Sequence, residues 1–147
     1  MGRVVKATLG ILAVALVGAQ AIRPERTNPP VENDVAAPPA IAPLLRRACY
    51  DCHSHETVWP WYSLVAPASW FLAHDVREGR AELDFSTWAA YGPVKKVKKL
   101  RETADEVTQG EMPPRLYLVA HREARLTDAE RRALADWCAD EIARLRH

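Results

Sequence analysis

The chain has 147 residues, which is enough for one domain and a tail. Its hydrophobic content of 48% and charged content of 27% are those of a globular protein and exclude a disordered chain. The formal net charge of +1 gives no global attraction to nucleic acid, which we therefore do not expect as a partner. Three cysteines are too few for a disulfide-stabilised scaffold.

Residues 1–22 have the pattern of an export signal, because two basic residues precede an apolar run that continues to Ile22. An Ala-Gln-Ala tripeptide at residues 19–21 suits a signal peptidase and favours cleavage. The run also approaches the roughly 20 residues that span a bilayer, and Arg23 supplies a flanking charge. Both alternatives export the rest of the chain, and we favour a retained membrane anchor.

Residues 23–40 form a proline-rich linker. Five prolines among small and polar residues exclude a helix or a central strand and predict a semi-rigid, extended spacer. With the anchor retained, this spacer would hold the domain a short distance from the membrane. We expect the folded domain to cover residues 41–147.

The first helix of this domain leads into the pentapeptide Cys49-Tyr50-Asp51-Cys52-His53. Two cysteines at this spacing, followed directly by a histidine, are the pattern of covalent haem c attachment. The two thiols would form thioethers with the haem vinyl groups, and His53 would be the proximal iron ligand. Three scarce residue types at fixed spacing make this a specific motif. Attachment of this kind occurs outside the cytoplasm, so we expect a periplasmic location.

The stretch after His53 is too aromatic for a solvent-exposed loop. Trp59, Trp61 and Tyr62 would bury large apolar areas while keeping polar tips for hydrogen bonds, and Trp70 follows on the helix that begins near Pro67. We assign all four aromatic residues to the surface that covers the porphyrin. The alternative is that they are ordinary core residues.

A third helix is predicted after a capped turn at residues 84–88. Apolar residues recur along it at helical spacing and predict a buried stripe, whereas five basic residues surround the rest of the helix. The basic residues are either the solvated face of the helix or a docking surface for an acidic redox partner protein. The stripe consists of Val94, Val97, Leu100, Ala104 and Val107, and the basic residues are Lys95, Lys96, Lys98, Lys99 and Arg101.

The last helix begins with a capping box, in which Thr127 is the N-cap and Glu130 occupies position N3. Cys138 lies on its apolar face beside Trp137, so we interpret it as a small buried hydrophobic residue. A redox thiol or an intermolecular disulfide is the alternative. No alternating strand pattern with hairpin signals occurs in the chain, and we therefore expect an all-α domain of the small cytochrome c type.

The second axial position of the iron is open to Met112 and to four histidines. Met112 is preferred because it lies in a proline-fixed loop between two helices, far along the chain from Cys52. His121, in the same connecting segment, is the main alternative. His55 is too close to the proximal ligand, His74 is expected to be an ordinary helix residue, and His147 is terminal.

These residues resemble those of a family of small bacterial haem-binding domains, c-type monohaem proteins, over roughly residues 23–145. The resemblance implies covalent haem c, export and a retained anchor, but no settled biochemical role. It rests on Cys49 to Ser54, Trp59 to Ser63, Ala66-Pro67, Ser69-Trp70, Gly79-Arg80, Phe85 to Trp88, Glu111 to Pro113, Tyr117, His121, Ala124 and Leu126.

The function that we expect is one-electron transfer by a haem with His53 and Met112 as ligands. The alternative is a haem-based sensor or small-ligand-binding module with an open or histidine-ligated iron, or an accessory to a peroxidase. An enzyme would need a distal acid–base residue, and no spacing favours His74 or His121 for this role. A thioredoxin-like pair or a zinc site formed by the cysteines lacks the surrounding pattern that each requires.

Overall fold

The computed structural model describes residues 2–146 of the chain, and within them it contains helices and no strand. This confirms the predicted all-α fold. The elements are α1 (Gly2–Ala19), α2 (Ala42–Ala48), α3 (Tyr50–His53), η1 (Trp61–Leu64), α4 (Ala68–Glu82), η2 (Phe85–Ala90), α5 (Pro93–Gln109), α6 (Tyr117–Ala120), η3 (Arg122–Ala124) and α7 (Asp128–Arg144), where η denotes a 3₁₀ helix.

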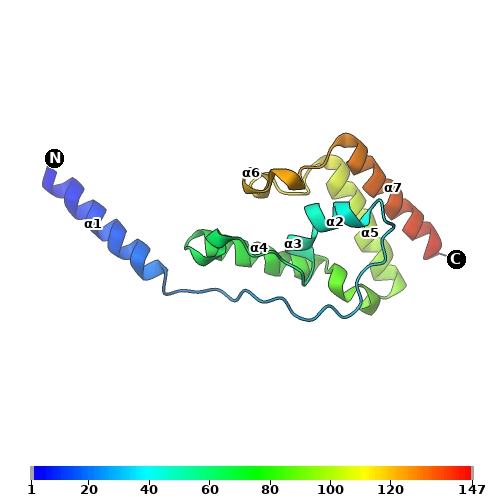
Figure 1. The fold of residues 1–147 in the computed structure, drawn as a ribbon, viewed down its shortest axis with the longest axis horizontal. Helices are drawn as coiled ribbons and strands as arrows, with labels where there is room; N and C mark the ends of the chain where they lie inside the picture. Colours follow the sequence, from blue (N-terminus) through cyan, green and yellow to red (C-terminus); the bar gives the residue numbers. More distant parts are fainter. Residues whose placement is uncertain (1, 147) are drawn as a thin grey trace.

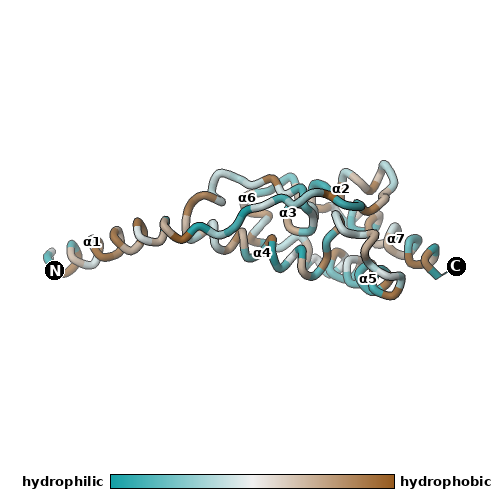
Figure 2. Tube along the Cα trace, turned by 90° about the horizontal axis from the view of Figure 1, so that it is seen from below, coloured by the Kyte–Doolittle hydropathy of each residue, from teal (hydrophilic) through white to brown (hydrophobic). Residues whose placement is uncertain are grey.

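Helix α1 projects away from the domain (Figure 1) and none of its residues is buried. Its 18 residues have a mean hydropathy of 1.6, which is sufficient in length and composition for a membrane span or a signal sequence. Apolar residues continue along α1 up to the point where it meets the domain (Figure 2). Within the described residues, the predicted N-terminal apolar segment is thus an exposed helix over Gly2–Ala19, and the residues that follow it contact the domain.

The proline-rich linker is extended, as predicted, but it is not a free spacer. It runs along the surface of the domain (Figure 1), and Val35 is buried in the core. Asp34 accepts a hydrogen bond of 2.8 Å from the hydroxyl of Tyr50, next to the first cysteine of the motif. The backbone N–H groups of Glu32 and Asn33 both donate to the carbonyl of Ser86. Proline prevents regular structure here, and side chains dock the segment onto the helices.

One part of the core lies between α5 and α7, which pack together as an antiparallel pair, and the rest is formed by buried residues of α2, α3 and the segments around Val35 and Phe85. The first turn of α5 lies near the end of α7, and the carbonyl of Val107 near the end of α5 accepts a hydrogen bond from Arg131 in the first turn of α7. Side chains from both helices fill the space between them. These buried residues are Leu100, Val107, Leu134, Trp137 and Cys138.

Two expectations for α5 are wrong. Val94, in the first turn of α5, is 87% exposed, because it borders an open hollow beside the end of α7 instead of the core. Lys99 is not on the solvated face but is buried, with its ammonium group between two carboxylates. The other four basic side chains remain accessible, and Lys95 lies over the ring of Tyr91.

The ends of the helices follow the local signals in the sequence. Thr127 and Glu130 form the predicted capping box at the start of α7. Asp84 caps η2 by accepting a hydrogen bond from the backbone N–H of Ser86. Helix α5 ends at Gly110, whose φ of 79° is a left-handed conformation that glycine adopts without strain.

Candidate functional site

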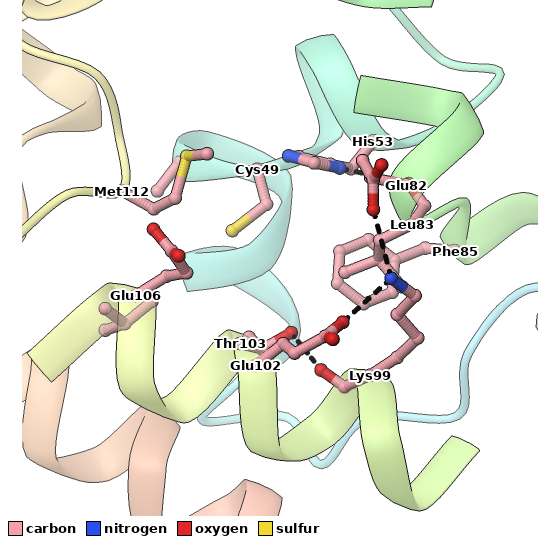
Figure 3. A pocket seen from close by; sticks show the side chains of 12 residues that line it. Cys49, His53, Glu82, Leu83, Phe85, Lys99, Glu102, Thr103, Glu106 and Met112 are labelled. Carbon is pink, nitrogen blue, oxygen red and sulfur yellow. Dashed lines mark hydrogen bonds and ion pairs between the residues drawn. The ribbon is translucent and has the colours of Figure 1, made fainter. Parts of the chain in front are cut away.

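A cavity of about 400 Å³ lies where α3 faces the end of α4 and the middle of α5, within the range of roughly 300–1,000 Å³ that is usual for cofactor sites. It brings Met112 together with Cys49 and His53, from which it is far apart in the sequence (Figure 3). The remaining lining residues are Ala48, Glu82, Leu83, Phe85, Lys99, Glu102, Thr103, Glu106 and Val107.

His53 is held in one orientation by two backbone carbonyls. Its Nδ1 lies 2.9 Å from the carbonyl oxygen of Gly79 and 3.0 Å from that of Leu83, so Nδ1 must carry the proton and donate. Burial lowers the pKa of the imidazole, which favours the neutral ring. The Nε2 lone pair is therefore available, and the tip of the ring points across the cavity toward Met112 (Figure 3).

Helix α3 approaches α4 so closely that only glycine fits at position 79. A Cβ atom at this position would lie 2.5 Å from the carbonyl oxygen of Cys52 and 3.0 Å from its Cβ. The same glycine supplies one of the two carbonyls that accept from His53. The absence of a side chain thus places the attachment motif and its histidine against α4.

Arg80, the next residue on α4, joins three segments around the motif. Its Nε donates to the carbonyl of Ser54 at 2.8 Å, and its Nη2 donates to the hydroxyl of Thr57 at 2.8 Å. The same guanidinium reaches the linker through the carbonyl of Thr27 and the side chain of Asn28. The chain on both sides of the haem motif is fixed to α4 through this one side chain.

Met112 follows α5 and is positioned from α7. Nη1 of Arg131 donates to the carbonyl of Met112 at 2.9 Å and to that of Val107 at 2.6 Å. The backbone N–H of Met112 donates to the carbonyl of Glu106 at 3.2 Å. The backbone around Met112 is therefore hydrogen-bonded on both sides, and its side chain faces the cavity opposite His53 (Figure 3). No signal in the sequence connected Arg131 with this loop.

The three cysteines form no disulfide with one another. Burial raises the pKa of Cys49 to about 12, and burial together with the charges of Asp51 and Asp75 raises that of Cys52 to about 12. Both groups are therefore thiols rather than thiolates at neutral pH. Cys49 lines the cavity, whereas Cys52 lies one helical turn further along and does not. Cys138 is fully buried, in line with its interpretation as a core residue.

The four described histidines differ in how their ring nitrogens are used. His55 is occupied on both sides, by Asp84 at 2.8 Å and by the carbonyl of Pro30 at 2.8 Å. His74 is exposed beside Asp75.

His121 does not line the cavity. Its ring stacks on Tyr117 with 4.0 Å between the ring centroids, and Nε2 lies 3.3 Å from the hydroxyl of Tyr62. Nδ1 lies 3.2 Å from the carbonyl of Tyr117, so both ring nitrogens have neighbours. His147, the fifth candidate ligand, lies outside the described residues.

The aromatic residues assigned to the porphyrin surface do not line this cavity. Trp61 is exposed, the indole of Trp59 donates to Asn28, and that of Trp70 donates to the carbonyl of Ile22. Tyr62 lines a separate apolar hollow between α4 and α6 together with Tyr117. Tyr117 in turn donates to Asp51 of the motif at 2.7 Å. The part that these aromatic residues play toward a haem stays a prediction.

One wall of the cavity is charged, which the sequence did not reveal. Nζ of Lys99 lies 2.7 Å from a carboxylate oxygen of Glu102 and 3.2 Å from one of Glu82 (Figure 3). Hydrogen bonding to Glu102 raises the pKa of Lys99, so the group stays a cation. The sequence did not predict the inward position of Lys99, because a run of five basic residues on α5 does not indicate which side chain is buried.

Comparison with known proteins gives one family. The sequence model of a family described as haem-binding domain matches residues 14–140, which is most of the chain. No curated protein and no solved structure matches the chain significantly.

Proposed function

This chain belongs to the haem-binding domain family, and on that premise we propose that it is a one-electron carrier with a single covalent haem c, ligated by His53 and Met112. The observation that carries the proposal is that the free Nε2 of His53 and the side chain of Met112 face each other across one cavity, beside the thiol of Cys49. When bound, the haem supplies a one-electron couple between ferric and ferrous iron.

The residues of the cavity fit such a group. Two thiols at the required spacing would hold the macrocycle through thioethers, Cys49 from the cavity and Cys52 from the adjacent turn. The carbonyls of Gly79 and Leu83 fix the tautomer and the orientation of His53 before any cofactor enters. A thioether ligand at Met112 and an apolar floor formed by Phe85, Leu83 and Val107 favour the less charged, reduced state.

With both His53 and Met112 as ligands, the iron would have no open position, which favours electron transfer over ligand sensing. His121 is a weaker second ligand, because both of its nitrogens already have neighbours on Tyr62 and Tyr117. A sensor or a peroxidase would need an open position, and Met112 is the residue that would close it.

We also propose that α1 is a retained anchor, which holds the domain on the periplasmic side of a membrane. The support is an apolar helix of 18 residues with no buried residue, followed by Arg23. The redox partner would be another protein of the same compartment, and the accessible basic residues of α5 suit an acidic partner.

The test compares the wild type with Met112→Ala and His121→Ala, after confirming covalent haem by its retention on denaturing gels. We expect the ferric wild type to show a methionine-to-iron charge-transfer band and the reduced protein to resist carbon monoxide. Met112→Ala should lose the band, bind carbon monoxide readily and have a lower reduction potential. His121→Ala serves as the matched control and should retain the wild-type spectrum.

Two results would contradict the proposal. A wild-type spectrum without the methionine band that is unchanged in Met112→Ala would remove Met112 from the iron. Tight carbon monoxide binding by the reduced wild type would instead identify an open, ligand-binding site.

A further inference from the structure

The end of α1 is hydrogen-bonded to one end of the domain. The side-chain amide of Gln20 donates to the carbonyl of Ala66 at 3.3 Å and accepts from the backbone N–H of Ala66 at 3.0 Å. The indole N–H of Trp70 donates to the carbonyl of Ile22 at 2.9 Å. The linker then leads away along the domain (Figure 1), so α1 ends beside η1 and the start of α4. The residues directly after α1 are therefore in contact with the domain at η1 and the start of α4.

This same end of the domain carries large apolar side chains in solvent. Trp61 is 76% exposed, Leu64 is 64% exposed and Phe71 is 66% exposed, and Val65 is also exposed. Leu64 and Ile22 line the same shallow hollow. Scattered exposed apolar residues are ordinary, but a group of this size on one short stretch indicates a contact surface.

We propose that this apolar end, formed by Trp61, Leu64, Val65 and Phe71, is a membrane-contact surface that lies on the bilayer in which α1 is anchored. The inference rests on the anchoring part of the proposed function. A bilayer that contains α1 has its surface at the end of this helix, where these side chains are found. Tryptophan is enriched at the membrane–water interface, because its ring is apolar and its N–H is polar.

Charge and geometry favour lipid over another protein as the occupant. Arg23 and Arg26 line the hollow beside Leu64, with Glu25 between them in sequence, so basic groups stand where anionic headgroups would lie. Attachment through α1 keeps the surface next to the bilayer at all times, so docking is an intramolecular event that needs little intrinsic affinity. A second copy or a soluble partner has no comparable attachment in this chain.

The consequence concerns the orientation of the haem site. The attachment motif lies on α3, and the cavity with Met112 lies on the side of α3 toward α5 and α7, further from α1 than the apolar end (Figure 1). A domain resting on η1 and the start of α4 would hold this cavity away from the lipid at a constant height. The α5 face would then be open to a soluble partner.

The test uses the full-length, haem-loaded protein in vesicles of phosphatidylethanolamine and phosphatidylglycerol that contain a lipid with a photoreactive diazirine near its headgroup. Cross-linked peptides are mapped by mass spectrometry. We expect lipid adducts on residues 2–22 and on residues 58–72, and none on residues 93–98. Leu64→Glu should reduce the adducts on residues 58–72 severalfold, whereas Val94→Glu, at a comparably exposed site on α5, should leave them unchanged.

Each other outcome overturns the proposal in a recognisable way. Adducts confined to residues 2–22 would mean that the domain stands away from the bilayer. Cross-links from residues 58–72 to a second chain would identify a dimer surface instead. An intact mass that lacks residues 1–22 would overturn the anchor and this surface together, while the haem spectrum of the same sample tests the redox proposal separately. Unchanged spectra in both variants exclude misfolding as the cause.

Discussion

The two walls of the cavity are built in different ways. The wall that carries His53 is fixed by backbone contacts, because Gly79 lets α3 touch α4 and two carbonyls hold the imidazole. The wall that carries Met112 is a loop after α5, and it is positioned by one arginine from α7. The first wall is fixed by direct backbone contact, whereas the second depends on the hydrogen bonds of one side chain.

This difference suggests a division of tasks. The proposed covalent haem would need an invariant proximal side, because the thioethers and the histidine would have to be in place together. The distal side would determine whether the iron is closed or open, and a loop held by hydrogen bonds can be adjusted by small changes. Substitutions in the wall that carries His53 should therefore destabilise the fold. Substitutions in the wall that carries Met112 should instead change the absorption spectrum of the haem-loaded protein.

The largest effect is expected for Gly79→Ala. The added Cβ would meet the carbonyl oxygen of Cys52 at 2.5 Å, and the neighbour is backbone, which cannot turn aside. We expect a loss of about 3 kcal/mol in the free energy of unfolding and poor haem attachment, measured by urea denaturation and by covalent haem content. Gly92→Ala is the control, since a Cβ there meets nothing within 4 Å. Equal stability of both variants would show that α3 and α4 can separate.

An intermediate effect is expected for Arg131→Ala. The carbonyl of Met112 would lose the hydrogen bond from Arg131, and that of Val107 would keep only the one from the N–H of Gly110, at a cost of about 2 kcal/mol in the free energy of unfolding. The methionine band should weaken while haem attachment is retained, because the proximal wall is untouched. Arg132→Ala, at an exposed neighbouring position, should change neither quantity. Loss of covalent haem in Arg131→Ala would contradict the separation of the two walls.

The smallest effect on the free energy of unfolding is expected when Glu130 is protonated at low pH. Hydrogen bonds from the backbone N–H of Thr127 and from Arg47 lower the pKa of Glu130 from 4.5 to about 2. Because the folded-state pKa is lowered, its stabilising contribution is complete above about pH 4.5 and is lost as the pH falls through about 2. The link from α2 to the first turn of α7 should weaken in this window.

This acid dependence is measured as the difference in urea midpoint between the wild type and Glu130→Gln at a series of pH values. The difference should be largest near neutral pH and should vanish at about pH 2. Glu123→Gln, at an exposed position without an ion pair, is the control. A difference that persists at about pH 2 would mean that Glu130 acts through something other than its charge.

Much of the local structure could be predicted because its causes are local. Thr127 and Glu130 form the capping box, Gly110 ends α5, and the prolines keep residues 23–40 free of helix. The Cys49–His53 motif was visible without the fold, because its pattern consists of three residues within one and a half turns; its role in attaching haem stays a prediction. What failed on α5 was the direction of individual side chains, since Lys99 is turned inward by Glu82 of α4 and Glu102, and Val94 lies in the first turn of α5 outside the core.

By itself the sequence determined the helical class and the apolar N-terminal segment, and it displayed the Cys49–His53 motif on which the proposal of covalent haem rests. All three depend on residues that are neighbours along the chain. Only the tertiary structure placed Met112 opposite His53, turned Lys99 inward and assigned Arg131 to the distal loop. It also showed that Gln20, just after α1, is hydrogen-bonded to Ala66, just before α4. These contacts join segments far apart in sequence, and their partners are chosen by packing rather than by local pattern.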